Sequence, residues 1–453
     1  MKNILVLGAG SSAGFLVHQL LADAEANDWF VTVGDLDLDL ARAAVGDHPR
    51  GTAIRFDVGD AEMTSAHVER ATVVVNMLPQ SFQPALAWSC LQHGKHMVSV
   101  SYRDREMTAM EEEVQRNGLL FLTEVGLDPG IDLMSAARQL QEIEARGGRV
   151  ERFESYGAGL PSLADAPNPV RYCITWNPRN VAMAGESGAQ YLEDGKVKIL
   201  PWHKLFRHTW TKEVPGIGLM EAYPNRDSLA YREVLRLEET RTLVRGTLRY
   251  PGWCGTWARI VELGLPNERI VIPELGRRSW AEIVEMFLPR DVPGDGLEER
   301  VARYLGIDFD GSEMENLRWL GLFDEEAAGI RGTTAADAVV HLLRTRLPLP
   351  PNGRDQVVLF HDVVVRYPEE EGRRERRRST LVAEGEPGGF TAMARTVGQP
   401  AAIAVRLLVR GELPLTGCRI PTHPTIYEPI LAELEATGLG FQETIEEITE
   451  ETS

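Results

Sequence analysis

Short apolar runs alternate with longer amphipathic segments through the first part of the chain. The runs resemble buried parallel strands, and the segments between them repeat apolar positions at helical spacing. This alternation predicts a parallel sheet covered by helices. The predicted strands are residues 3–7, 29–33, 53–56, 72–76, 94–100 and 119–122, and the clearest predicted helices are residues 12–23, 83–93, 106–117 and 131–144.

The turn after the first predicted strand is rich in glycine. Residues 8–14 read Gly-Ala-Gly-Ser-Ser-Ala-Gly, which matches GxGxxA with a further glycine beside the alanine. Glycines permit the tight turn and let the backbone approach a pyrophosphate at the helix N-terminus. The flanking strand and helix favour a dinucleotide site over a glycine-rich turn that binds nothing. We therefore predict a Rossmann domain whose cofactor contacts include Gly8, Gly10, Ser11, Ser12 and Ala13.

An acidic residue, Asp35, stands at the end of the second predicted strand. A carboxylate at this position accepts hydrogen bonds from the ribose 2′-hydroxyl of a dinucleotide and repels a 2′-phosphate. The next arginine in the sequence is Arg42, and Asp37 and Asp39 add negative charge. The residues themselves therefore favour NAD over NADP.

Further cofactor contacts are expected where other strands end, because dinucleotides bind at the carboxyl ends of parallel strands. Asp57 and Val58 follow the third predicted strand, where the aspartate is expected near the adenine. Asn76, Met77 and Leu78 form the loop after the fourth strand.

Residues 126–132, Gly-Leu-Asp-Pro-Gly-Ile-Asp, join this pattern to the rest of the chain. Asp128 before Pro129 predicts a helix N-cap followed by proline at the first helical position. A carboxylate between a cofactor domain and a second domain is also a candidate catalytic group. A cap alone and a cap that also takes part in catalysis both remain open for Asp128.

The pattern changes beyond residue 148. Strands are predicted at residues 149–156, 242–250, 356–367 and 378–383, with a loop at 157–161 and period-two alternation in 242–250. Residues 266–346 are mostly helical, and helices are also predicted at 401–411 and 427–437. The charged run 369–378 is predicted to be a solvated hairpin tip.

Composition narrows the class of protein. The 453 residues are 43% apolar and 25% charged, as in soluble globular proteins. A formal charge of −19 argues against nucleic acid or an anionic membrane as a partner. The four cysteines are scattered without metal-ligand spacing, so no metal site is predicted. We find no signal peptide and no membrane-spanning run, and we expect a cytoplasmic protein.

Several longer motifs resemble the glutamate-forming saccharopine dehydrogenases, also called saccharopine reductases. The similarity extends along nearly the whole chain and is more specific than the glycine turn. It rests on residues 126–132, Ser155-Tyr156 with Gly159-Leu160-Pro161, residues 223–228 (Tyr-Pro-Asn-Arg-Asp-Ser), residues 245–250 (Arg-Gly-Thr-Leu-Arg-Tyr), and Ile420-Pro421-Thr422 before Ile426-Tyr427.

The resemblance implies an α/β architecture of three parts. The Rossmann domain is expected at residues 1–130 and 393–453, because the chain of such proteins returns to it near the C-terminus. An α/β substrate domain with a mixed or antiparallel sheet is expected at 131–265 and 347–392, and a small inserted helical domain at 266–346. The oligomeric state stays open, and a homodimer formed through the substrate-domain sheet is compatible with the sequence.

The family oxidises the secondary amine of saccharopine by hydride transfer to a nicotinamide, and water then releases glutamate from 2-aminoadipate 6-semialdehyde. The resemblance implies a small amino-acid substrate with three carboxylates, which arginine forks bind bidentately. The substrate-contacting positions it implies are Ser101, Tyr102, Arg226, Thr247, Leu248 and Arg249, and Ser101 is expected to contact the cofactor as well. It also implies contacts between the nicotinamide amide and the backbone of Leu127, Asp128 and Pro129, and it makes Asp128 the leading base with Tyr102 behind it.

Two of these residues have simpler interpretations. Arg226 with Asp227 is also compatible with a surface ion pair, and Arg249 with a solvent-facing position on its strand. The chain also departs from the family at two places. Gly157 stands where a cysteine is common, which excludes a cysteine base there, and Gly34-Asp35-Leu36-Asp37 stands where NADP-using members carry an arginine-containing turn. NADP therefore follows from the resemblance, and NAD from Asp35.

Two other functions are compatible with a nicotinamide-binding fold. One is a related imine or amine reductase of polyamine metabolism, of the carboxynorspermidine or homospermidine type. Its cationic substrate would need acidic residues where Arg226 and Arg249 stand. The other is a protein that binds NAD without turnover, against which the set of Tyr102, Asp128 and the two arginines argues.

Overall fold

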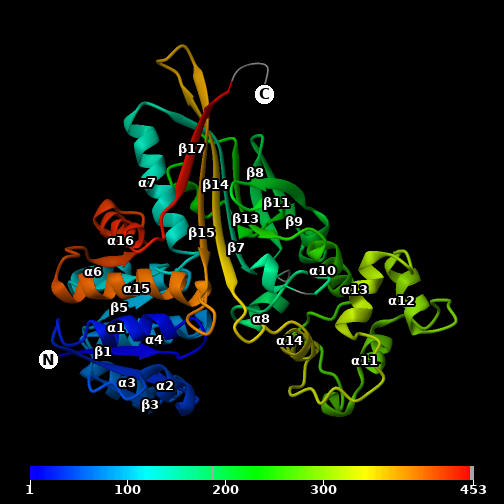
Figure 1. Cartoon of the computed structure of the whole chain (residues 1–453). Helices are drawn as coiled ribbons and strands as arrows, with labels where there is room; N and C mark the ends of the chain where they lie inside the picture. Colours follow the sequence, from blue (N-terminus) through cyan, green and yellow to red (C-terminus); the bar gives the residue numbers. More distant parts are fainter. Residues whose placement is uncertain (167, 185–187, 449–453) are drawn as a thin grey trace. The chain divides into compact units, whose positions relative to one another are not determined.

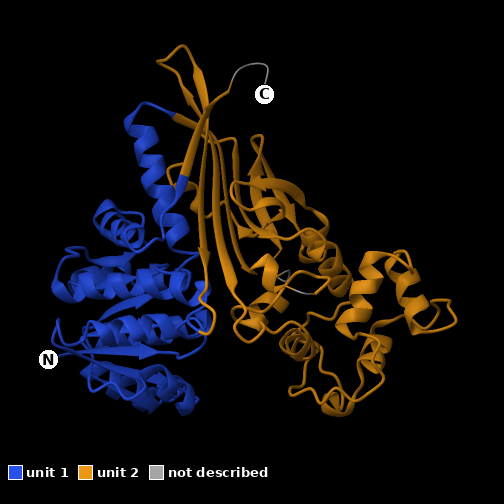
Figure 2. Ribbon diagram, in the orientation of Figure 1, with its two compact units in different colours: residues 1–148, 389–442 blue, residues 149–388, 443–453 orange. Residues whose placement is uncertain are grey.

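The computed structural model divides into two compact units, and the first combines the N-terminal part of the chain with a segment from near its C-terminus. The structure describes residues 1–166, 168–184 and 188–448. The first unit contains Met1–Gly148 and Gly389–Gln442, and the second contains Arg149–Gly388 and the residues from Glu443 onward (Figure 2). Helix α7 thus lies in the first unit, and residues 266–346 lie in the second rather than in a third.

The first unit is built on a parallel sheet, which confirms the predicted α/β fold with a Rossmann domain. The described strands have the order β16-β6-β5-β4-β1-β2-β3, and Figure 1 labels β1, β3 and β5 of this sheet. All six predicted strands are present, and the order reverses between β1 and β4, where such folds bind nucleotides. The strands are β1 (Lys2–Leu7), β2 (Trp29–Asp35), β3 (Gly51–Arg55), β4 (Val73–Asn76), β5 (His96–Ser99), β6 (Leu120–Leu122) and β16 (Gly417–Arg419).

Helices pack against this sheet on both faces. Helices α3 and α4 share a core with β1, β4 and β5 that contains Leu5, Val74 and Leu86. Helix α15 packs on α1 and contacts β4 and β5. The helices of this unit are α1 (Gly14–Ala22), α2 (Leu38–Val45), α3 (Ala61–Arg70), α4 (Gln83–Gln92), α5 (Arg105–Ala109), α6 (Glu111–Arg116), α7 (Ile131–Ala145), α15 (Ala392–Arg410) and α16 (Pro424–Ala436), with a 3₁₀ turn η1 (Gln80–Phe82).

Two helix predictions differ from the structure. The predicted helix 106–117 is divided at Met110 into α5 and α6. The predicted helix 401–411 begins at Ala392 instead, because the hydroxyl of Thr391 accepts a hydrogen bond from the Ala394 N–H at 3.0 Å and caps it there. Pro400 lies inside this helix, which is why the sequence suggested a later start.

The second unit contains a mixed sheet. Its described strands follow the path β10-β11-β13-β7-β14-β15-β17, with β8, β9 and β12 branching from it. The β13–β7 pair is parallel and the β14–β7 pair is antiparallel. The strands are β7 (Arg149–Pro161), β8 (Ala189–Glu193), β9 (Lys196–Leu200), β10 (Trp210–Val214), β11 (Gly218–Pro224), β12 (Arg226–Asp227), β13 (Thr242–Arg249), β14 (Asp355–Tyr367), β15 (Arg373–Glu384) and β17 (Gln442–Glu447).

The predicted loop at residues 157–161 is wrong. These residues continue β7, and Gly157 pairs with Leu359 of β14 while Pro161 pairs with Asp355. The turn signals of Gly and Pro are overridden here because β14 pairs with β7 along its length, and β13 pairs with its other side as far as Gly157.

The mostly helical residues 266–346 pack into the same hydrophobic core as the sheet of the second unit. Trp253 and Trp257 of α10, Ile283 of α11 and Leu343 of α14 belong to the same cluster as Leu248 of β13. This shared core explains why residues 266–346 do not form a separate unit. The helices are α8 (Pro178–Ala182), α9 (Tyr231–Val234), α10 (Trp253–Glu262), α11 (Trp280–Phe287), α12 (Leu297–Leu305), α13 (Ser312–Leu320) and α14 (Ala335–Arg346), with 3₁₀ turns η2 (Leu163–Asp165), η3 (Trp202–Arg207) and η4 (Leu275–Arg277).

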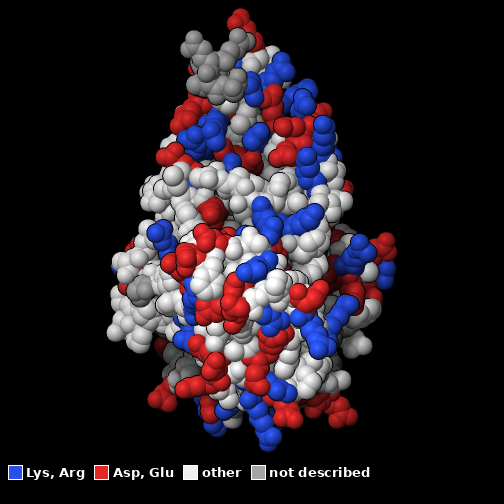
Figure 3. Space-filling model, turned by 90° about the vertical axis from the view of Figure 1, so that its right-hand side faces the viewer, with Lys and Arg blue, Asp and Glu red and all other residues white. Residues whose placement is uncertain are grey.

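The charged run 369–378 is a solvated tip only in part. Residues from Arg373 onward belong to β15, and Glu375 and Arg377 are buried and joined by a hydrogen bond of 2.6 Å. Arg376 forms a two-pronged pair with Asp362 of β14. The arginines of this hairpin are therefore paired with acids, and basic and acidic side chains are interspersed on the face shown in Figure 3. Within the described residues, no helix is long and apolar enough to cross a lipid bilayer.

The contact between α1 and α15 gives a test of the first unit. A Cβ added at Gly398 would lie 2.7 Å from the backbone nitrogen of Leu16, which cannot move aside. We expect Gly398→Ala to lower the free energy of unfolding by about 1–3 kcal/mol in chemical denaturation. Gly255→Ala in α10 is the matched control, since its nearest neighbour is the end of the Glu313 side chain at 3.6 Å. It should raise stability by up to about 1 kcal/mol, and equal effects of the two variants would contradict the packing.

Candidate functional site

The glycine turn lies between β1 and α1, as predicted. Gly8 has φ +100°, and a Cβ there would lie 2.8 Å from the carbonyl oxygen of Met77, so only glycine fits. A Cβ at Gly10 would meet no atom within 4 Å, so one side of the turn is open. Ser11 is exposed and Ser12 half-buried, while Ala13 is buried at the N-cap of α1 and makes no side-chain cap. The free N–H groups of the first helical turn suit an anion.

The Asp35 carboxylate is fixed beside this turn. Its Oδ2 accepts a hydrogen bond from the Ala9 N–H at 2.7 Å, and its Oδ1 accepts one from the Asp37 N–H at 2.9 Å. Both oxygens keep a lone pair for a further donor, such as a ribose hydroxyl. Asp35 therefore connects the glycine turn to the end of β2.

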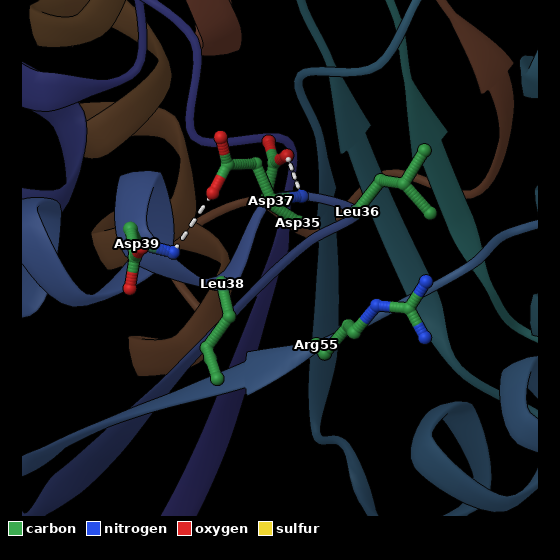
Figure 4. Close-up of a pocket in the computed structure, with 6 residues that line it drawn as sticks. All are labelled: Asp35, Leu36, Asp37, Leu38, Asp39 and Arg55. Carbon is green, nitrogen blue, oxygen red and sulfur yellow. Dashed lines mark hydrogen bonds between the residues drawn. The ribbon is translucent and has the colours of Figure 1, made fainter.

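A pocket of about 660 Å³ opens beside Asp35 and is lined by residues 35–39 and Arg55 (Figure 4). Asp37 caps α2 by accepting from the Asp39 N–H at 3.0 Å, and Asp39 pairs with Arg42 at 3.2 Å. Arg55 lies opposite Asp35 in the β2–β3 register. Three carboxylates and one guanidinium thus surround the place expected for the adenosine ribose.

Asp57 and Val58 follow β3 but do not line this pocket. Asp57 is exposed, and its Oδ1 accepts a hydrogen bond from the Gly59 N–H at 2.9 Å. Val58 is half-buried against the core beneath α3 and α4. The adenine contact expected of them stays a prediction.

The loop after β4 is held by a buried polar network. Asn76 is fully buried and its Oδ1 accepts a hydrogen bond from the Leu78 N–H at 3.1 Å. Its Nδ2 donates to Ser99 Oγ at 3.2 Å and reaches Gln83 Oε1 at 3.5 Å. The side chain of Asn76 therefore shapes the loop from inside, and Met77 contributes its backbone beside Gly8. Gln83 and Ser99 were missed in the sequence, since no motif marks them.

Asp128 is not the helix cap that its sequence context suggested. Helix α7 begins at Ile131 with Gly130 as N-cap, and the Asp128–Pro129 peptide is cis. The Gly130 N–H donates instead to Asp132 Oδ1 at 2.7 Å, and the Ile131 N–H donates to the Gly126 carbonyl at 2.9 Å. The Asp-Pro rule fails because residues 126–130 fold into a tight turn before the helix starts.

The half-buried side chains of Asp128 and Tyr102 lie together at the carboxyl edge of the sheet. The Tyr102 hydroxyl donates to Asp128 Oδ1 at 3.4 Å, a long hydrogen bond. Ser101 is half-buried beside them, and its N–H donates to Ser99 Oγ at 3.1 Å. A carboxylate next to a phenol can accept and pass on a proton, which is what general acid–base chemistry needs. Leu127 and Pro129 are buried on either side of Asp128.

The remaining predicted residues lie in the second unit. Arg226 is exposed on β12 with φ +53°, and the carboxylate of Asp227 accepts from the Leu229 and Ala230 N–H groups at 2.9 and 3.2 Å. Thr247 is half-buried on β13, and the Leu248 side chain is fully buried in the core.

Arg249 does not face solvent, so the simpler interpretation of its strand position is wrong. It is 4% exposed and stacked among aromatic rings, 5.2 Å from the centre of Tyr172, 5.9 Å from Tyr223 and 4.9 Å from Trp253. Its Nε–H has no hydrogen-bond partner, although one terminal N–H donates to the Leu248 carbonyl at 3.0 Å. The period-two pattern misled because helix α10 covers this end of the strand.

Comparison with known proteins places this arrangement in a family. Residues 4–122 match the domain described as the saccharopine dehydrogenase NADP binding domain, and residues 126–439 match the saccharopine dehydrogenase C-terminal domain. The chain belongs to the saccharopine dehydrogenase family. The resemblance of the motifs is confirmed.

Individual members of the saccharopine dehydrogenase family align along nearly the whole chain. It is 32% identical to saccharopine dehydrogenase [NADP(+), L-glutamate-forming] of Saccharomyces cerevisiae, covering 96% of this chain and 97% of that protein. It is also 32% identical to mouse mitochondrial alpha-aminoadipic semialdehyde synthase over 97% of its length, but spans only 47% of that longer protein.

Solved structures agree with this assignment. The apo saccharopine dehydrogenase (L-Glu forming) of S. cerevisiae superposes with a TM-score of 0.86 at 29% identity, covering 98% of this chain and 100% of that one. A homospermidine synthase of Legionella pneumophila in complex with NAD gives a TM-score of 0.54 at 12% identity, covering 99% of this chain and 91% of that one. The second likeness shows a shared fold alone.

The cysteines of this saccharopine dehydrogenase family member are unsuited to act as bases or nucleophiles. Cys90, Cys173, Cys254 and Cys418 are all buried and free of disulfides. Burial raises the pKa of the Cys173 thiol to about 11 and that of Cys418 to about 12, and it raises the pKa of the other two as well. Among the described residues, no cluster of three or more His, Cys, Asp or Glu side chains is arranged to hold a metal.

Asp132 and Asp128 provide a matched pair of variants that tests which carboxylate stabilises the N-terminus of α7. Asp132 is 3% exposed and accepts the N–H of Gly130, so Asp132→Ala leaves a buried donor without its acceptor. We expect this variant to lose about 1–3 kcal/mol of unfolding free energy, and Asp128→Ala to lose less than about 1 kcal/mol. Chemical denaturation of both variants checks this, and a larger loss at Asp128 would restore it as the cap.

Proposed function

We propose that this protein is a saccharopine dehydrogenase of the glutamate-forming type. Saccharopine, an oxidised nicotinamide dinucleotide and water would give glutamate, 2-aminoadipate 6-semialdehyde, the reduced dinucleotide and a proton. The observation that carries the proposal is the Tyr102–Asp128 pair at the carboxyl edge of a dinucleotide-binding sheet. The full-length similarity to the yeast enzyme supports it.

The residues of the glycine turn fit a dinucleotide. Open space beside Gly10 lets a pyrophosphate approach the backbone, and the N–H groups of the first turn of α1 can donate hydrogen bonds to its phosphate oxygens. A bound nicotinamide would supply the hydride acceptor. The loops that follow β4, β5 and β6 carry Leu78, Ser101 and Asp128 at the same edge of the sheet, where the ring is expected.

Proton transfer is the part of the reaction that we assign to the side chains of this unit. The substrate amine must be neutral before its carbon can give up a hydride, and the Asp128 carboxylate is the acceptor for that proton. Tyr102 holds one oxygen of this carboxylate through its hydroxyl. Once that proton has passed to solvent, the regenerated Asp128 carboxylate can accept a proton from the water that attacks the oxidised substrate.

Substrate carboxylates call for arginine in the second unit. Arg226 is exposed on β12, so its guanidinium is accessible to a small amino-acid substrate. Arg249 carries a buried charge within the aromatic cluster of Tyr172, Tyr223 and Trp253, with one N–H group lacking an acceptor. A substrate carboxylate would satisfy that donor if the cluster opens on binding.

Within this function we propose that NAD is preferred to NADP. Asp35 is oriented by two backbone N–H groups, and Asp37 and Asp39 line the same pocket. A 2′-phosphate would meet these carboxylates, of which Asp39 is paired with Arg42, and the guanidinium of Arg55. The yeast relatives are named for NADP(+), and the matching N-terminal domain is described as NADP binding. We infer NAD for this chain because Asp35, at the end of β2, stands where the ribose is expected.

The cofactor proposal is tested by following the reduced nicotinamide with saccharopine and each cofactor in parallel. We expect a higher kcat/KM with NAD, and Asp35→Ser should shift the ratio of the two kcat/KM values toward NADP by roughly tenfold or more, as loss of a nearby like charge implies. Asp39→Ser, in which the lost charge is already paired with Arg42, is the control. A strong NADP preference in the unaltered protein would overturn the role given to Asp35.

The catalytic proposal is tested at Asp128 and Tyr102. Asp128→Asn should lower kcat by roughly 10²- to 10⁴-fold, because the amide cannot accept the proton, while dinucleotide binding by fluorescence titration stays within about threefold. Tyr102→Phe should lower kcat less, since the carboxylate remains. Turnover of Asp128→Asn at the unaltered rate would remove Asp128 from the chemistry. The unaltered protein should also be assayed with saccharopine and, in parallel, with polyamine conjugates. Absence of saccharopine turnover would contradict the proposed function.

A further inference from the structure

A single buried glutamine joins the two loops that lead into the candidate site. Gln83 is the first residue of α4 and is fully buried. Its Oε1 accepts a hydrogen bond from Ser99 Oγ at 2.5 Å, and its Nε2 donates to the carbonyl oxygen of Tyr102 at 2.8 Å. It therefore contacts both the end of β5 and the residue that carries the proposed catalytic hydroxyl.

The hydrogen-bonding capacity of the network fixes the orientation of each group in it. The single proton of Ser99 goes to Gln83, and its oxygen accepts from Asn76 Nδ2 at 3.2 Å and from the Ser101 N–H at 3.1 Å. A hydroxyl has one proton and two lone pairs, so Ser99 is fully used. Rotating the Gln83 amide by half a turn would aim its oxygen at the Tyr102 carbonyl, so one orientation is allowed.

The network ends on three backbone groups. These are the N–H of Leu78 in the loop after β4, and the N–H of Ser101 and the carbonyl of Tyr102 after β5. A buried polar network is stable only when its members are satisfied together, so the two loops are held in one relative position. Gln83 is the member that reaches Tyr102 directly.

We propose that Gln83 is a positioning residue for Tyr102, and the inference rests on the proposed function. By holding the Tyr102 carbonyl it directs the phenol toward Asp128, whose Oδ1 lies 3.4 Å from the hydroxyl. Displacements of about 1 Å in such groups can cost 10²-fold in rate. A merely structural Gln83 would affect stability and leave the turnover of the folded enzyme unchanged.

The test compares three variants of the full chain. Gln83→Met removes both hydrogen bonds at similar volume. Gln80→Met is the matched control, because exposed Gln80 reaches the same Tyr102 carbonyl only at 3.5 Å. Leu86→Ala is a destabilising control, since Leu86 is a fully buried core residue of the same helix that is outside the network.

We expect Gln83→Met to lower kcat by roughly ten- to a hundredfold while the KM for the dinucleotide changes by less than about threefold. Gln80→Met should be close to the unaltered enzyme, and Leu86→Ala should lower Tm without lowering kcat of the folded fraction. If Gln83→Met and Leu86→Ala lower kcat equally at matched loss of Tm, the positioning role is overturned.

A measurement of hydrogen exchange keeps this inference separate from the proposed function, and a pH profile tests it a second time. Hydrogen exchange of the Ser101 amide should be faster in Gln83→Met than in Gln80→Met, and this is measurable without any turnover. Equal exchange would overturn the inference even if saccharopine is the substrate.

The second test uses Gln83→Glu. Its carboxyl group can donate a hydrogen bond to the Tyr102 carbonyl when protonated but not when ionised. We therefore expect the turnover of this variant, relative to the unaltered enzyme, to fall as the pH rises. A pH profile parallel to that of the unaltered enzyme would count against it.

Discussion

The candidate site depends on a short turn that closes on itself through backbone hydrogen bonds. The N–H of Gly126 donates to the Pro129 carbonyl at 3.0 Å, and the N–H of Ile131 donates back to the Gly126 carbonyl at 2.9 Å. A Cβ at Gly130 would lie 2.0 Å from the Gly126 oxygen, so the closure requires glycine there. These groups are paired inside the turn, Asp132 accepts the Gly130 N–H, and Asp128 Oδ1 accepts a hydrogen bond from the Tyr102 hydroxyl.

Local signals in the sequence were sufficient to predict most strands and the glycine turn of the first unit. The alternation of apolar runs, the glycine turn and Asp35 were predicted because each lies within one strand–turn–helix segment. Strand β16 was not, since its partner β6 lies about two thirds of the chain length away, with Gly417 paired to Leu120. Gln83 and Ser99 were missed for the same reason, because a helix start and a strand end become partners only in the folded sheet.

Predictions from neighbouring residues failed where a tertiary contact determined the position of the side chain instead. Asp-Pro suggested a cap, but the tight turn at Gly130 moved the helix start and gave capping to Asp132. Alternation suggested a solvent-facing Arg249, but α10 and its tryptophans enclose that end of β13. The family resemblance supplied the roles of Tyr102 and Arg226, for which the residue pattern alone offered no distinctive signal.

Glutamate-forming oxidation of saccharopine is tested most directly by product analysis with a deuterated substrate. The deuterium is placed on the carbon of the lysine-derived half that is bonded to the secondary amine nitrogen. We expect deuterium to appear in the reduced nicotinamide and glutamate to be released in equal amount. Oxidation at the other carbon of the same amine would give lysine and a 2-oxo acid instead. Those products, or the absence of reduced nicotinamide, would contradict a glutamate-forming saccharopine dehydrogenase.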